Sequence, residues 1–124
     1  MKNIEEKILI VEDEMAMSET LELLLEDYGL ECEIATTGEE GLQLLKKKKF
    51  KVVLVDLRLP GMNGLQFIQR AHEMNPEISF IIITGSIEFD RKEIAHIDKV
   101  SKRIFYKPVS NVSDLIEEIL FLLE

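Results

Sequence analysis

The 124-residue sequence predicts an α/β fold in which helices cover both faces of a parallel β-sheet. Three predominantly apolar runs lack the alternation of a half-exposed strand: 8–11, 52–55 and 78–83. Such runs are typical of strands buried on both faces, as at the centre of a parallel sheet. Segments with the apolar spacing of amphipathic helices separate them. The two patterns together predict one doubly wound domain over residues 1–124, in which five strands alternate with five helices.

The first strand, 7–11, leads into a predicted helix over 15–28. Apolar side chains recur there at three- and four-residue spacing and form one stripe: Met17, Leu21, Leu24, Leu25 and Tyr28. Gly29 supplies the stop, because glycine readily adopts the left-handed backbone conformation that ends many helices. The alternating segment 31–35 predicts a short strand at the edge of the sheet.

Thr37 is the predicted N-cap of a second helix, with Glu40 three residues on. Lysines 46–49 end this helix. Four lysines also suit an anion-binding patch, but a solvated helix end that interacts well with the helix dipole is the preferred interpretation. The central strand, 52–55, follows and ends at Asp56.

Turn signals fill the loop 57–64, and a third helix is predicted over 64–74, where Asn75-Pro76 ends it. The strand 78–83 then leads to Thr84-Gly85. This third apolar run places another polar group at a strand end.

The last third of the chain carries weaker signals. A fourth helix is predicted over 88–100 from a three-residue apolar repeat: Ile94, Ile97 and Val100. The last strand, 103–106, is followed by Lys107-Pro108. Ser110 or Asn111 can cap a final helix with a strong apolar stripe: Val112, Leu115, Ile116, Ile119, Leu120 and Leu123.

Composition excludes several classes of function. Twenty-four acidic residues against fifteen basic ones give a net charge of −9, so no direct contact with nucleic acid is expected. No apolar run approaches the roughly 18 residues of a membrane span, so no membrane insertion is expected. Cys32 is the only cysteine, which rules out an internal disulfide. With the acidic, polar N-terminus, it indicates a cytoplasmic protein.

Chemically active side chains follow four of the predicted strands: Glu12-Asp13, Asp56, Thr84 and Lys107. The carboxyl ends of parallel strands lie at one edge of a sheet, so these groups should converge. Two unit charges ~4 Å apart repel by about 4 kcal/mol at an effective dielectric near 20. A hard divalent cation would offset that repulsion, and Mg²⁺ suits oxygen ligands that leave room for water.

These groups suit phosphoryl transfer. Asp56, the lone acid on the central strand, is the candidate nucleophile that attacks phosphorus in line. Asp13 is expected to bind the metal directly, and Glu12 through water. Lys107 pairs with Asp56 or with a phosphoryl oxygen, and the hydroxyl of Thr84 receives the transferred group.

The sequence resembles the receiver domain of two-component response regulators. The resemblance covers essentially the whole chain and rests on four stretches: 8–14, 55–64, 83–85 and Lys107-Pro108. Each stretch alone is weak evidence. In this order, and at close to the usual spacing, they are highly specific together.

The resemblance implies a flavodoxin-like sheet with strand order 2-1-3-4-5. It also implies that Asp56 accepts a phosphoryl group from a histidine kinase or a histidine phosphotransfer protein. Mg²⁺ would be required, with the backbone carbonyl of Arg58 as a further ligand. Such a domain is no conventional enzyme, since it catalyses phosphotransfer to its own Asp56 and hydrolysis from it. A cis Lys107-Pro108 bond is expected as well, because a tight turn would aim the ammonium at Asp56.

Receivers signal by a conformational change to a downstream protein effector or a fused output domain. The surface of the fourth helix, last strand and last helix is expected to carry that signal. The family usually has Tyr or Phe three residues before the lysine as the moving aromatic, and Ile104 stands there. Tyr106 should project from the same strand face as Ile104. Tyr106, or a shift of the helix over 88–100, is therefore predicted to replace the usual switch.

Other function classes fit less well. A non-phosphorylated receiver-like binding module would keep the fold without the chemistry. The full set of site residues argues against it, although Ile104 keeps it open. A magnesium-dependent phosphodiester enzyme of the Toprim kind would need a second Asp near Asp56, and position 58 is Arg. A flavodoxin-type cofactor site needs glycine and hydroxyl residues after the first strand, where this chain is acidic.

Overall fold

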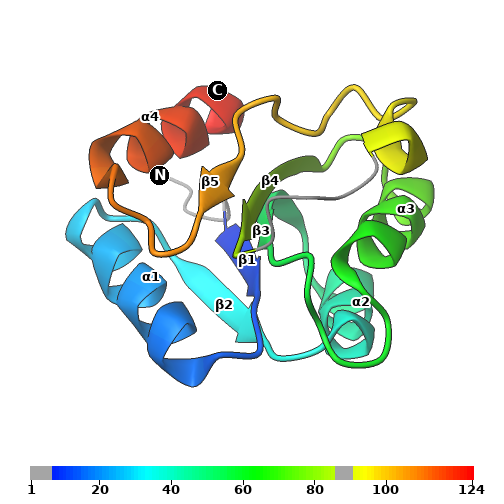
Figure 1. Cartoon of the computed structure of the whole chain (residues 1–124), viewed down its shortest axis with the longest axis horizontal. Coiled ribbons are helices and arrows are strands. Elements are labelled where there is room, and N and C mark those ends of the chain that lie inside the picture. The colour runs from blue at the N-terminus through cyan, green and yellow to red at the C-terminus, as the bar shows by residue number, and fades with distance from the viewer. Residues whose placement is uncertain (1–6, 86–90) are drawn as a thin grey trace.

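The computed structural model describes residues 7–85 and 91–124, which form a five-stranded sheet with helices on both faces (Figure 1). The strands are β1 (Lys7–Val11), β2 (Cys32–Ala35), β3 (Phe50–Val55), β4 (Ser79–Thr84) and β5 (Phe105–Tyr106). They lie in the order β2-β1-β3-β4-β5, and every pair is parallel. The doubly wound sheet and its predicted strand order are confirmed.

Helices pack in two layers on opposite faces of this sheet (Figure 1). The helices are α1 (Met15–Asp27), α2 (Gly38–Lys47), α3 (Gly64–Met74) and α4 (Val112–Leu123), with a 3-10 helix η1 (Arg91–Ile94). Figure 1 shows α1 and α4 on one face, and α2, α3 and η1 on the other. Within the described residues, no helix has both the length and the apolar character needed to cross a membrane.

Alternate residues of the central strands supply two hydrophobic cores. In β1, Leu9 and Val11 belong to the core beneath α2 and α3, whereas Ile8 and Ile10 belong to the core beneath α1 and α4. β3 and β4 divide in the same way. Eight apolar residues of these two strands are at most 1% exposed: Val52, Val53, Leu54, Val55, Phe80, Ile81, Ile82 and Ile83. Because both faces are covered, the sequence of these strands shows no apolar alternation.

Local signals set the helix ends much as predicted. The side chain of Thr37 accepts a hydrogen bond from the backbone N–H of Glu40 (3.0 Å) at the start of α2. Gly29 follows α1 with φ of +75°, a conformation that favours glycine. Asn111 is the N-cap residue of α4, although its side chain makes no capping hydrogen bond there.

The prediction of a helix over 88–100 is wrong for the residues that the structure describes. Residues 88–90 lie outside them. Arg91–Ile94 forms a single stretch of 3-10 helix, and 95–100 contains two turns and ends in one bridge residue. The chain therefore has four α-helices and one 3-10 helix in its described parts.

The hydrogen bonds of this segment account for the difference. The N–H of Ile97 donates to the carbonyl of Ile94 (3.0 Å), and the N–H of Val100 donates to that of Ile97 (3.3 Å). Each bond spans three residues, the period of a 3-10 turn and not the 3.6-residue period of an α-helix. Ile94 and Ile97 are buried in the core shared with α3, so the apolar repeat marks a packed series of turns.

The last strand is shorter than the predicted range 103–106. Only Phe105–Tyr106 pairs with β4 in a regular ladder. Earlier in β4, the backbone of Phe80 is already paired: its N–H donates to Lys99 (3.0 Å) and its carbonyl accepts from Ser101 (2.8 Å). The chain then leaves the sheet before it returns as β5.

Gly64 lies where the loop after β3 folds back against that strand. A Cβ atom there would lie 2.4 Å from the carbonyl oxygen of Asp56 and 2.6 Å from the Cα of Leu57. Both are backbone atoms, so no side-chain rotation could relieve the overlap. The hydrogen bond from the N–H of Gly64 to the carbonyl of Leu57 (3.0 Å) holds the same close approach.

We expect Gly64→Ala to lower the free energy of unfolding by about 1–3 kcal/mol, because the methyl group displaces backbone next to Asp56. Urea denaturation measures this change. Gly85→Ala is the matched control, since a Cβ at Gly85 meets no atom within 4 Å. Equal stability of the two variants would show that the loop has room to move.

Candidate phosphoryl-transfer site

The candidate site lies at the carboxyl ends of β1 and β3, the neighbouring strands at which the chain connections diverge. Open α/β sheets bind their ligands in the crevice at such a point. Val11 is paired with Val55, so Glu12 and Asp56 each follow directly after the last residue of a strand. The N–H of Asp56 donates to the carbonyl of Val11 (3.1 Å), which fixes the start of the loop.

Three carboxylates converge at this point, as the sequence predicted. One oxygen atom from each of Glu12, Asp13 and Asp56 lies within 4.8 Å of the other two. Glu12 and Asp56 are buried, whereas Asp13 is exposed. Hard oxygen donors gathered from one side, with an open side for water, fit a magnesium ion.

The ammonium of Lys107 balances part of this negative charge. Its Nζ lies 2.7 Å from Oε1 of Glu12, 2.9 Å from Oδ2 of Asp56 and 2.8 Å from Oε1 of Glu14. Burial by itself would lower the pKa of Lys107, but hydrogen bonds to the three carboxylates outweigh it and raise that pKa. The lysine is therefore firmly protonated in the folded protein.

Burial raises the pKa of the Glu12 carboxyl group, and the nearby negative charge of Asp56 raises it further. The hydrogen bonds from Lys107 and from the backbone N–H of Glu14 lower the pKa, but they do not cancel the cost of burial. A further cation at the site would therefore stabilise the charged form of Glu12.

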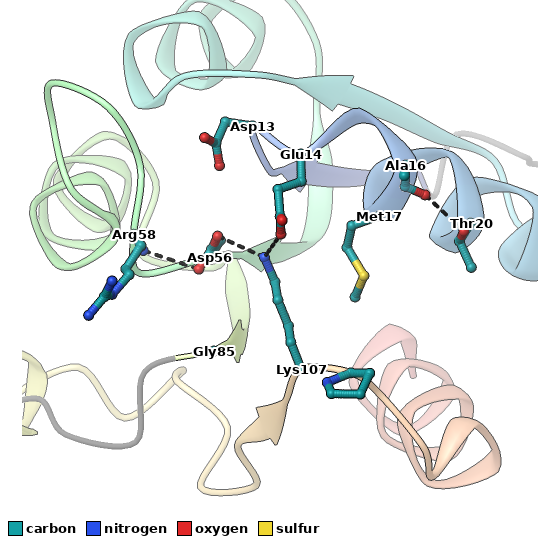
Figure 2. Close-up of a pocket in the computed structure, with 10 residues that line it drawn as sticks. Asp13, Glu14, Ala16, Met17, Thr20, Asp56, Arg58, Gly85 and Lys107 are labelled. Carbon is teal, nitrogen blue, oxygen red and sulfur yellow. Dashed lines mark hydrogen bonds and ion pairs between the residues drawn. The ribbon is translucent and has the colours of Figure 1, made fainter.

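Glu14 is a contact of Lys107 that the sequence reasoning did not assign. Figure 2 shows its side chain reaching the ammonium of the lysine from the residue that precedes α1, next to Asp56. Hydrogen bonding to Lys107 lowers the pKa of Glu14. The signal available in the sequence was its place directly after Glu12-Asp13, one residue beyond the acids that were chosen.

The loop after β3 contacts the other oxygen of Asp56. The backbone N–H of Arg58 donates to Oδ1 of Asp56 (3.1 Å), and the side chain of Arg58 points away from the carboxylates (Figure 2). Asp56 thus has one oxygen bound to backbone and the other to Lys107. The predicted role of the Arg58 carbonyl as a metal ligand stays a prediction.

Thr84 ends β4 next to the final strand and is fully buried. Its carbonyl accepts a hydrogen bond from the backbone N–H of Lys107 (2.9 Å), which fixes the backbone of the lysine at this edge of the sheet. The Lys107-Pro108 peptide bond is cis, as predicted. The predicted role of the Thr84 hydroxyl stays a prediction.

An open cleft of about 730 Å³ lies over these groups (Figure 2). Asp13, Asp56, Arg58 and Lys107 line it, together with Gly85. Glu12 and Thr84 lie behind this lining, because each is almost fully buried. The cleft therefore leaves Asp56 and Lys107 open to a ligand from solvent.

Comparison with known proteins identifies the family. A family model described as the response regulator receiver domain matches residues 8–120. The receiver domain protein (CheY-like) from Methanospirillum hungatei JF-1 superposes with a TM-score of 0.83 at 33% identity, covering 95% of this chain and 93% of that one. A receiver domain protein from Clostridium thermocellum gives a TM-score of 0.82 at 27% identity, covering 94% and 93%.

Curated relatives are longer proteins. The cell cycle transcriptional regulator CtrA of Caulobacter vibrioides is 33% identical over 86 residues, which are 69% of this chain and 37% of that protein. The response regulator ArlR of Staphylococcus saprophyticus is 31% identical over 102 residues, 82% of this chain and 46% of that protein. The chain spans less than half the length of these two relatives. With the fold, the site and the match over residues 8–120 in agreement, the chain belongs to the response regulator receiver domain family of two-component signal transduction.

Proposed function

We propose that this receiver is controlled by phosphorylation and that Asp56 is the residue phosphorylated. The observation that carries the proposal is the 2.9 Å contact between Nζ of Lys107 and Oδ2 of Asp56, next to two further carboxylates. Convergent buried acids cost stability, so a fold that keeps them points to a chemical role. The phosphoryl donor is a histidine kinase or a histidine phosphotransfer protein.

The chemistry needs few protein groups. A carboxylate oxygen of Asp56 forms a bond to phosphorus as the bond from phosphorus to the donor's imidazole nitrogen breaks. Lys107 binds an oxygen of the transferred group, and the hydroxyl of Thr84 donates to another. Hydrolysis by water later returns Asp56 to its free carboxylate, so the domain acts only on itself.

Mg²⁺ is the proposed cofactor. Asp13, Asp56 and the backbone carbonyl of Arg58 would hold the ion directly, and Glu12 through water. When bound, it supplies positive charge that offsets both the carboxylates and the phosphoryl oxygens. The convergence of one oxygen from each of three carboxylates within 4.8 Å supports this assignment.

Output is proposed to pass by protein contact, to an effector or a fused output domain. Tyr106 pairs with Thr84 across β4 and β5, and the residue is 43% exposed. Ile104 is instead partly buried against the core that contains Ile94 and Ile97. This arrangement supports Tyr106 and the segment around η1 as the part of the surface that responds to the phosphoryl group.

Incubation with acetyl phosphate and Mg²⁺ should add one phosphoryl group to the chain, visible by intact-mass spectrometry. Asp56→Asn or a chelator should abolish the adduct, because the nucleophile or the neutralising ion is gone. Asp27→Asn, an exposed acid on α1, is the control that should still react. An adduct that survives Asp56→Asn would refute the assignment. No adduct on the unaltered chain would favour a non-phosphorylated binding module.

Mg²⁺ should stabilise the fold, because it binds the native carboxylate group and not the unfolded chain. At about 100 times its dissociation constant, the free energy of unfolding should rise by about 2.7 kcal/mol. Urea denaturation with and without chelator measures this gain. Asp13→Asn should lose most of this Mg²⁺-dependent gain. In chelator, its free energy of unfolding should equal or exceed that of the unaltered protein, because one repelling charge is removed. A full gain in Asp13→Asn would place the ion elsewhere.

Beryllofluoride with Mg²⁺, a mimic of the phosphoryl group, should change the backbone NMR signals of Thr84, Gly85 and 91–97 more than those of α2. The reason is that these residues join the site to the proposed output surface. Heteronuclear spectra of the free and bound states give the comparison. Movement of α1 with an unchanged Thr84, Gly85 and 91–97 would locate the output surface elsewhere.

A further inference from the structure

The ammonium of Lys107 has three hydrogen-bond donors and three carboxylate partners. Glu12, Glu14 and Asp56 accept at 2.7, 2.8 and 2.9 Å. Binding a phosphoryl oxygen therefore requires the lysine to give up one of these contacts. Which contact it gives up decides how readily the site accepts a phosphoryl group.

The three carboxylate partners of Lys107 differ in how far they are buried. The side chains of Glu12 and Asp56 are 2% and 5% exposed, whereas that of Glu14 is 64% exposed. Breaking an ion pair with a buried carboxylate leaves a desolvated charge without its partner, which is costly. Water can replace the lysine at an exposed carboxylate, so that ion pair is worth little. The contact to Glu14 is thus the one most easily released.

The backbone nevertheless holds Glu14 in place. Glu14 is the N-cap residue of α1, and its N–H donates to Oε2 of Glu12 (3.0 Å). The other oxygen of Glu12 binds Lys107. One buried carboxylate therefore fixes both the backbone of Glu14 and the ammonium that Glu14 contacts, while the side chain of Glu14 stays at the open side of the cleft (Figure 2).

We propose that Glu14 is a positioning residue that competes with the phosphoryl group for Lys107. It holds the ammonium in the resting protein and releases it when a phosphoryl oxygen arrives. The competition sets the affinity of the site for its phosphoryl group and thereby the threshold at which the receiver responds. This inference rests on the proposed phosphorylation of Asp56.

Glu14→Gln tests the competition, because it removes the charge and keeps the shape of the side chain. Its dissociation constant for beryllofluoride, at a saturating Mg²⁺ concentration, should fall about two- to fivefold, the range that exposed ion pairs support. Isothermal titration calorimetry measures it. Glu19→Gln is the matched control, since Glu19 is an exposed acid on α1, the helix that directly follows Glu14, and the substitution makes the same change in net charge. It should bind like the unaltered chain.

Glu14→Asp separates contact from charge. It retains the carboxylate but is one methylene shorter, so the 2.8 Å contact with Lys107 should lengthen. If the contact matters, the affinity of Glu14→Asp for beryllofluoride should rise toward that of Glu14→Gln. An affinity equal to that of the unaltered chain would reduce the role of Glu14 to general repulsion and overturn the proposal.

A second readout needs no phosphoryl mimic. In the metal-free protein, the side-chain NMR signal of Lys107 Nζ should shift in Glu14→Gln and stay unchanged in Glu19→Gln. An unshifted signal in Glu14→Gln, or equal beryllofluoride affinities for Glu14→Gln and Glu19→Gln, would refute the competition and leave the proposed phosphorylation of Asp56 intact. Failure of the unaltered chain to bind beryllofluoride would refute the proposed function and, with it, this inference.

Discussion

The balance of charge around Lys107 is the constraint on which the functional end of this molecule depends. The ammonium of Lys107 contacts three carboxylates, of which those of Glu12 and Asp56 are buried and that of Glu14 is exposed. Removing one partner from a buried ion pair costs about 3–5 kcal/mol, because an unpaired charge stays desolvated. The lysine therefore stabilises the acidic end of the fold. In the proposed function, a metal ion and a phosphoryl group would take over part of that charge balance, so the same side chain would serve both stability and chemistry.

Most of the architecture could be predicted from the sequence because the sheet is covered on both faces. Buried central strands produce unbroken apolar runs, and the polar residue that ends each run marks the edge of the sheet. That logic predicts Glu12, Asp13 and Asp56 at one edge of the sheet, and the structure brings one oxygen of each together. Cap residues at Thr37 and Gly29 act over a few residues, so they too could be predicted locally.

The rest depended on contacts between distant segments. The repeat of Ile94 and Ile97 indicates an apolar face at every third residue, but only packing against α3 decides that the chain forms 3-10 turns there. The length of β5 depends on the pairing of Phe80 with Lys99 and Ser101, 19 and more residues away. The contact of Glu14 spans 93 residues, from the start of α1 to Lys107, so sequence spacing alone gave it no distinct signal.

Site mapping of the phosphoryl group tests the central claim most directly. Borohydride reduces an aspartyl phosphate to homoserine, which leaves a stable mark at the modified residue. After incubation with acetyl phosphate and Mg²⁺, reduction and proteolysis, peptide sequencing by mass spectrometry should find homoserine at position 56 and at no other acidic residue. Homoserine at position 13, the one-carbon-longer alcohol 5-hydroxynorvaline at Glu12, or no reduced residue at all would contradict the assignment of Asp56 as the phosphoacceptor that Lys107 serves.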